Sequence, residues 1–320
     1  MFFYQLYGMM VVSDLEMPRL LTAKPSDFPK DKQIIVCQST IPAPYDQMPV
    51  KSYQYSPEVS FLSNDGCSIL VKNGNVILYQ IKPHPYATSL VSYILGFGMA
   101  MLFLQRQMLA FHCSSVSKNG KAVLIAGNSG SGKSTITNAL LDRGYSLMSD
   151  DMTVVDPLHF EHPIAYPAFP FQKLCRDVVE KRNLNQDDLV YINEKKDKYL
   201  VPAPSFQSKE MPVVAMFHLN AADTLPVTAI SDEASAVLGS NPSSDNFSMV
   251  WRKLNGLSTW EACKQALFLH AIVADHLHEK ALAVPTLQFA SACPMYHIIR
   301  KNNVDSSVPI VELIEKIMQS

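Results

Sequence analysis

The sequence predicts an α/β protein in which a small β-rich N-terminal domain precedes a larger domain of alternating strands and helices. Two observations predict this class. The first 80 or so residues carry short apolar runs separated by prolines and an Asn-Gly pair, which is typical of strands and turns. From His112 onward, an apolar run, a glycine-rich loop and an amphipathic helix follow one another. The 320 residues, 48% of them hydrophobic and 18% charged, suffice for a substantial core.

Residues 1–85 predict the small domain, with antiparallel strands. Phe2 to Val12 is almost wholly apolar, and Gln33 to Cys37 is a short β-branched run. The clearest hairpin joins Cys67–Val71 to Val76–Ile81, because the residues between them include Asn-Gly, a strong signal for a tight turn. This part of the chain indicates no chemistry of its own.

Residues 86–110 predict one apolar connecting helix. The stretch from Pro85 to Gln105 has no charged residue, which reaches the lower edge of the length that a membrane-spanning helix needs. Gly96 and Gly98 interrupt the stretch and a strand pattern follows at once. A buried helix is therefore favoured over a membrane span.

Residues 111–320 predict the larger domain. Ala122–Ala126 is a continuous apolar run, the mark of a strand covered on both faces, and Ser134–Arg143 predicts a helix that Gly144 ends. The later elements are expected as short strands at 147–148 and 153–155, a proline-rich loop at 163–170, a buried strand at 211–219, a surface loop at 231–248, a helix at 258–278 opened by a capping box, a strand at 296–299 and a helix at 309–318.

The composition excludes several classes of partner and site. A net charge of -2 gives no basic field for nucleic acid. The six cysteines are widely separated and form no C-x-x-C pair, which indicates reduced thiols in a cytoplasmic protein, and the first residues lack the pattern of a signal peptide. The His159/His162 and His276/His278 pairs lack the further ligands of a zinc site, so we expect surface residues.

The glycine-rich loop carries the strongest motif. Gly127 to Ser134 matches G-x-x-x-x-G-K-[ST], in which glycines bring backbone N–H groups against phosphate oxygens. Lys133 would reach the β- and γ-phosphates, and the Ser134 hydroxyl would ligate Mg²⁺. We therefore expect ATP as ligand, with Mg²⁺ or Mn²⁺. The expected nucleotide-binding residues are Gly127, Asn128, Ser129, Gly130, Ser131, Gly132, Lys133, Ser134 and Thr135.

Asp150 and Asp151 follow the helix at a strand edge. Phosphoryl transfer to a hydroxyl needs a metal ligand and a carboxylate that takes the acceptor proton, and this pair suits both roles. The residues alone leave open which aspartate has which role, and a solvated acidic turn is the alternative. His112, before the first strand, is a third candidate, against the alternative of a satisfied core residue.

Other cations are weaker candidates. Lys173 and Arg176 follow the proline-rich loop and are candidates for a transition-state cation. Lys195, Lys196 and Lys198 lie beside acidic residues and are candidates for phosphate or acidic-substrate contacts, against the alternative of a solvated turn.

The stretch from His112 to Asp151 resembles the HPr kinase/phosphorylase family. Three matches carry the resemblance: His112 before the loop strand, the spelling Gly-x-Ser-Gly-x-Gly-Lys-Ser at 127–134, and Arg143-Gly144-Tyr145-x-Leu147 leading into Ser149-Asp150-Asp151. The stretch is more distantly similar to ATP-dependent phosphoenolpyruvate carboxykinase, which shares the P-loop kinase fold. Outside it, Tyr7-Gly8, Ser13-Asp14-Leu15-x-x-Pro18 and Leu200-Val201-Pro202 look like HPr-kinase-related proteins found beside peptide-modification genes.

The resemblance implies a P-loop kinase domain of the HPr kinase/carboxykinase type. It implies that His112, Lys133, Ser134, Asp150 and Asp151 surround the nucleotide and the metal. The carboxykinase pattern favours Asp150 near the acceptor and Asp151 on the metal, which the loop motif also assigns to Ser134. Thr135 stands where HPr kinases commonly have an acidic residue, which argues against HPr itself as the acceptor.

The sequence thus predicts an ATP-dependent kinase that transfers the γ-phosphate to a hydroxyl. The expected acceptor is a serine of a protein or peptide, or a small serine-like molecule. Two alternatives remain: a nucleotide-binding regulatory module without turnover, and a carboxykinase-like enzyme acting on a small acid. The oligomeric state is left open, a homo-oligomer included.

Overall fold

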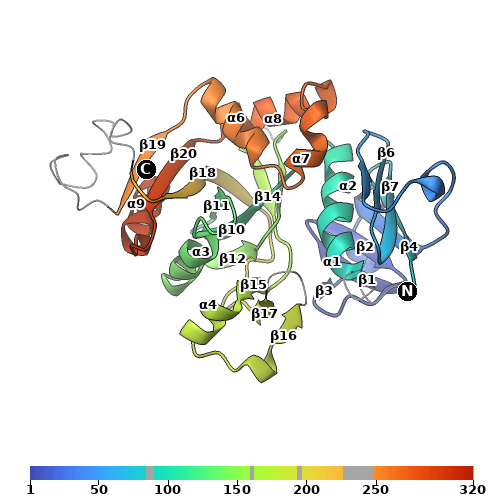
Figure 1. Ribbon diagram of the computed structural model, residues 1–320, viewed down its shortest axis with the longest axis horizontal. Helices are drawn as coiled ribbons and strands as arrows, with labels where there is room; N and C mark the ends of the chain where they lie inside the picture. Colours follow the sequence, from blue (N-terminus) through green and yellow to red (C-terminus); the bar gives the residue numbers. More distant parts are fainter. Residues whose placement is uncertain (84–89, 159–161, 193–196, 226–247, 320) are drawn as a thin grey trace.

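The protein is a mixed α/β structure built on three sheets. The computed structural model describes residues 1–83, 90–158, 162–192, 197–225 and 248–319. Figure 1 shows the N-terminal sheet at one side of the molecule, the large central sheet with its helices at the other, and the small third sheet projecting below.

The N-terminal sheet has eight strands, as the apolar runs of the first 85 residues predict in outline. Most neighbours are antiparallel, including the predicted hairpin, but β4 runs parallel to both β2 and β8, so the antiparallel prediction is wrong there. The long connection after β2 returns the chain to the same end of the sheet, which a hairpin cannot do. In sheet order the strands are β3 (Leu21–Thr22), β1 (Phe2–Leu6), β2 (Met9–Ser13), β4 (Gln33–Gln38), β8 (Val76–Ile81), β7 (Cys67–Lys72), β6 (Val59–Ser63) and β5 (Ser52–Gln54).

Residues 86–89 of the predicted connecting helix at 86–110 lie outside the described residues, and the rest is less regular than expected and ends earlier. It consists of α1 (Leu90–Tyr93), a π-helical turn (Ile94–Gly98) and α2 (Met99–Gln105). After Gln107, which has a φ of 59°, the chain reverses and β9 (Leu109–Phe111) pairs with the central sheet. Within the described residues, no helix has both the length and the apolar character to cross a membrane.

The central sheet holds the strand–loop–helix unit. Its strands β11, β18 and β20 run parallel, β11 leads through the glycine-rich loop into α3 (Lys133–Asp142), and α3 and α9 (Ser307–Gln319) pack on one face. The predicted elements at 122–126, 134–143, 211–219, 296–299 and 309–318 are thus confirmed to within a few residues. The strands are β10 (Cys113–Lys118), β11 (Lys121–Gly127), β12 (Ser146–Ser149), β13 (Thr153–Asp156), β14 (Ile164–Tyr166), β18 (Met211–Ala222), β19 (Met249–Lys253) and β20 (Met295–Lys301), besides β9.

The small third sheet follows the proline-rich segment. That segment is not only a loop, because its residues 164–166 form β14. The sheet order is β15 (Phe171–Cys175), β17 (Lys198–Pro202) and β16 (Val190–Ile192), with α4 (Arg176–Lys181) packed beside it. The sequence analysis did not predict this sheet.

The predicted helix of residues 258–278 is broken. Its first part is α6, which covers Leu257–Gln265. Leu267 then forms an isolated β-bridge with Phe111, and a separate helix, α7 (His270–Val273), follows. The cause is competition for backbone groups, since the Ala266 carbonyl accepts from His112 N–H and the Phe268 N–H donates to Ala110. The capping box is also absent, because the Ser258 hydroxyl donates to the Asn255 carbonyl instead. A helix that was not predicted, α8 (Lys280–Ala292), follows.

One apolar cluster joins the N-terminal sheet to the central sheet. It runs from Tyr4 and Ile69 through the buried helix α2 to Leu124 and Met295. The limits at residues 85 and 110 therefore mark changes in the pattern of elements, and as domain boundaries they remain predictions. The predicted surface loop at 231–248 lies, except for Ser248, outside the described residues.

Candidate active site

The glycine-rich loop joins the end of β11 to the start of α3, as the motif predicts. Gly127 has a φ of 144°, and a Cβ there would lie 2.2 Å from the Leu219 carbonyl oxygen, so only glycine fits. Gly132, with a φ of 101°, precedes the first turn of the helix. The Ser131 hydroxyl is buried and has no hydrogen-bond partner within the described part of the chain. The loop thus has a glycine-lined cradle and an unsatisfied donor.

Lys133 folds back over this loop. Its Nζ lies 2.6 Å from the Gly127 carbonyl oxygen and 3.2 Å from that of Asn128. Burial lowers the pKa of Lys133, although the nearby charge of Asp151 acts in the opposite direction. Ser134 is half-buried and Thr135 exposed in the first turn of α3, while Asn128, Ser129 and Gly130 are exposed at the tip of the loop.

Arg300, on β20, forms hydrogen bonds with the backbone of the glycine-rich loop. Its Nε donates to the Ser131 carbonyl over 2.7 Å and its Nη2 to the Gly130 carbonyl over 2.9 Å. A Cβ on Gly132 would lie 3.0 Å from the same Nε, so the guanidinium packs closely against the loop. Sequence reasoning missed Arg300, because it lies about 170 residues further along the chain.

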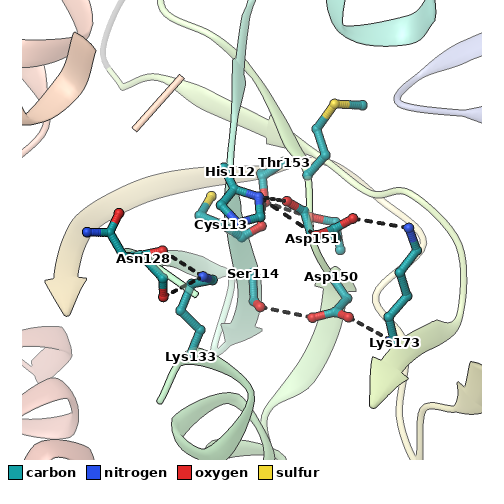
Figure 2. A network of polar contacts seen from close by, with 12 residues as sticks. His112, Cys113, Ser114, Asn128, Lys133, Asp150, Asp151, Thr153 and Lys173 are labelled. Carbon is teal, nitrogen blue, oxygen red and sulfur yellow. Dashed lines mark hydrogen bonds and ion pairs between the residues drawn. The ribbon is translucent and has the colours of Figure 1, made fainter. Parts of the chain in front are cut away.

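Asp150 lies in the turn between β12 and β13, as predicted. Its Oδ1 accepts from the Ser114 hydroxyl over 3.0 Å, and its Oδ2 accepts from the backbone N–H of Lys173 over 2.7 Å (Figure 2). Burial raises the pKa of Asp150 above its ordinary value despite these bonds. A carboxylate held by two donors, with a raised pKa, is suited to proton transfer.

Asp151 adopts a φ of 67°, in the left-handed region. Its Oδ2 lies 3.1 Å from Lys173 Nζ, and its Oδ1 lies 3.7 Å from His112 Nδ1 (Figure 2). Burial alone would raise the pKa of Asp151, but the charges of Lys173 and His112 outweigh it and hold the pKa below its ordinary value. The same His112 nitrogen lies 3.0 Å from the Asp151 carbonyl oxygen, and burial lowers the pKa of His112.

Buried hydrogen bonds support the aspartate turn from behind. The hydroxyls of Ser115, Ser149 and Thr153 form a chain with oxygen distances of 2.9 and 2.6 Å. From the N-terminal sheet, the Tyr7 phenol donates to the Met152 carbonyl over 3.1 Å. In the sequence, Ser114 and Ser115 inside the strand at 113–118 are the signal of these buried hydrogen bonds.

The structure brings three predicted residues, His112, Asp150 and Asp151, into one network. Lys173, also a candidate from the sequence, joins them. The charge of Lys133 acts on the pKa of His112, and the charges of Asp150 and Asp151 act on the pKa of Lys133. Lys198 is also close enough for its charge to act on His112, Lys133 and Asp151. No contact joins Ser134 or Thr135 to the aspartates in the described region of the protein.

The remaining candidate residues lie elsewhere. Arg176 is not part of the network, since it forms an ion pair with Asp197. His162 is exposed, and His276 is hydrogen-bonded to Glu279. Lys195, Lys196 and His159 fall outside the described residues.

The predicted metal ligands, Asp151 and Ser134, carry oxygen donors. Across the described residues, no group of three or more His, Cys, Asp or Glu side chains could hold a metal. Mg²⁺ at a phosphate site needs only one or two protein oxygens, because it keeps waters and phosphate oxygens as its other ligands. Asp151 and the Ser134 hydroxyl are oxygen donors of that kind.

Comparison with known proteins gives little further information. No family model and no curated protein matches the chain. Among solved structures, the chain is similar to the Hpr(Ser) kinase/phosphatase from Coxiella burnetii at 15% sequence identity, over 66% of this chain and 93% of that chain, with a TM-score of 0.30.

Proposed function

We propose that this protein is a kinase that transfers the γ-phosphate of ATP to a hydroxyl group. The acceptor class is a serine of a protein or peptide, or a small serine-like alcohol. The observation that carries the proposal is a G-x-x-x-x-G-K-S loop between β11 and α3 whose lysine lies close enough to the Asp150–Asp151 turn for the carboxylate charges to act on its pKa. The resemblance of residues 112–151 to HPr kinases supports the same reading.

The loop would hold the phosphates. Gly127 and Gly132 allow the loop its positive-φ turns and its close packing against Leu219 and Arg300, and the Ser131 hydroxyl is a buried donor without a protein partner in the described chain. Lys133 would exchange its two carbonyl contacts for the β- and γ-phosphate oxygens and neutralise charge that develops during transfer.

The two aspartates would divide the remaining tasks. Asp150 would take the proton of the acceptor hydroxyl, because its raised pKa brings it closer to neutral pH and two donors fix its orientation. Asp151, kept ionised by Lys173, would serve with Ser134 as a metal ligand. Mg²⁺, when bound, neutralises phosphate charge and orients the transferring group.

Binding and transfer are tested separately. ATP binding with Mg²⁺ is measured by calorimetry for the wild type, for Lys133→Ala and for Lys316→Ala, a control at an exposed lysine on α9. We expect binding to be lost only in Lys133→Ala. Transfer is then measured as γ-phosphate incorporation into a serine peptide library, with mass spectrometric readout.

The outcomes separate the proposal from its alternatives. Unchanged ATP-dependent activity in Lys133→Ala would contradict the kinase proposal. ATP binding without any modified acceptor would favour the regulatory module. Release of carbon dioxide from oxaloacetate with ATP would favour a carboxykinase-like enzyme.

A further inference from the structure

A second polar cluster lies on the other side of the glycine-rich loop from the aspartates. It consists of His218 and Asn220 on β18 and His297 on β20. The two imidazole ring centres are 6.0 Å apart, and Asn220 Nδ2 lies 2.9 Å from His297 Nε2. None of the three was singled out from the sequence, since only the pairing of β18 with β20 aligns them.

The cluster lies level with the last residues of β11, where the glycine-rich loop begins, while β18 and β20 continue beyond it. In the parallel register, His218 is the partner both of Ala126 on β11 and of His297 on β20. The next residue of β18, Leu219, is the one whose carbonyl excludes a Cβ from Gly127. Ligands of open α/β sheets bind beyond the carboxyl ends of parallel strands, and β11 is the parallel strand that ends at this level.

The chemistry of the cluster suits an uncharged ligand group. All three side chains are half-buried. Burial, with the charges of His297 and Lys133, lowers the pKa of His218 to about 4, and burial also lowers the pKa of His297. Both rings are therefore neutral at physiological pH, and each offers one donor and one acceptor. Such groups match the edge of a nucleobase or the hydroxyls of a ribose, whereas phosphate oxygens favour cations.

The in-line geometry of phosphoryl transfer indicates which part of the phosphate donor lies near the cluster. β11 has β10 on one side, whose Ser114 binds Asp150, and β18 on the other. The attacking and leaving oxygens lie roughly in line, so an acceptor on the Asp150 side puts the leaving nucleoside diphosphate on the β18 side. Resting on the proposed kinase function, we propose that His218, Asn220 and His297 bind the nucleoside of the phosphate donor.

The test compares two ligands that differ only by the nucleoside. Dissociation constants of ATP and of inorganic tripolyphosphate, both with Mg²⁺, are measured by calorimetry on the full chain. The variants are His297→Leu and the milder Asn220→Ala, each checked by thermal unfolding. The control is His162→Leu, an exposed histidine before β14, which pairs with the opposite end of β18.

We expect each cluster variant to weaken ATP about tenfold, the scale of one or two lost hydrogen bonds, and to leave tripolyphosphate unchanged. The control should change neither. Equal weakening of both ligands, or unchanged ATP affinity in both folded variants, would overturn the nucleoside assignment while leaving the kinase proposal intact. A wild type that binds neither ligand would overturn the kinase proposal itself and the assignment with it.

Discussion

The ammonium of Lys173 lies 3.1 Å from Asp151 Oδ2 and forms a half-buried ion pair with it. The backbone N–H of the same lysine donates to the neighbouring carboxylate, that of Asp150. Lys173 therefore contacts both aspartates, Asp151 through its side chain and Asp150 through its backbone. The side chain can be replaced while the backbone donor stays in place.

Lys173→Met should shift the acidic limb of the pH–rate profile to higher pH. The Lys173 charge acts to lower the pKa of Asp150, the proposed base, and helps to keep the pKa of Asp151 low, so its loss lets both aspartates take up a proton at a higher pH. The stability that the low pKa provides exists above the ordinary pKa of aspartate and is lost as pH falls through the folded value, so it also shrinks. Lys173→Arg should retain the wild-type profile, and an unmoved acidic limb in the methionine variant would contradict the role of this ion pair.

Asp150→Asn should abolish transfer without lowering stability at neutral pH. The pKa of Asp150 is raised in the folded protein, so its ionised form destabilises the fold above that pKa. Asparagine still accepts from the Lys173 N–H and donates to Ser114. Urea unfolding should show the variant as stable as the wild type or more so at pH 7, with the difference vanishing below the ordinary pKa of aspartate. A variant that is inactive and clearly less stable at pH 7 would indicate a structural role instead.

Gly127→Ala should destabilise the protein far more than Gly120→Ala. Both glycines have positive φ, which costs an alanine about 1–2 kcal/mol. Only at Gly127 would the new Cβ meet a backbone atom, the Leu219 carbonyl oxygen at 2.2 Å, whereas nothing lies within 4 Å at Gly120. Thermal unfolding of the two variants separates backbone strain from the clash, and equal losses would mean that the loop moves freely to accommodate a side chain.

Arg300→Met should weaken ATP binding while the protein stays folded. The guanidinium makes two hydrogen bonds to the loop, and their loss frees the tip of the cradle. We expect about a tenfold higher dissociation constant for ATP and an equal change for tripolyphosphate, since the loop holds phosphates. Arg182→Met, which removes only a surface ion pair with Asp142, is the matched control and should bind as the wild type does. Wild-type affinity in Arg300→Met would show that the loop is rigid without this anchor.

Local signals explain what could be predicted from the sequence. Eight contiguous residues, 127–134, specify both the loop and the start of α3, because glycine conformation and helix initiation depend on near neighbours. The hairpin at 67–81 is local in the same way, since Asn-Gly sets its turn.

What escaped prediction depends on distant pairing. Arg300 reaches the loop only through the placement of β20, and the contacts of Lys173, itself a candidate from the sequence, with both aspartates depend on the placement of β15. The helix expected at 258–278 is interrupted because the strand segment around Phe111 takes its backbone hydrogen bonds. The parallel pairing of β4 follows from the path of the preceding loop rather than from the strand itself.

The contact between Tyr7 and Met152 has a consequence for genetics. The phenol of a residue in the first hairpin holds the carbonyl next to Asp151, and the apolar cluster behind it is shared by both sheets. Removing the first strands would strip the aspartate turn of that support and uncover the buried face of α2. Missense or in-frame deletion alleles that affect the first hairpin would therefore be scored as enzymatic nulls, although they alter neither the loop nor the aspartates.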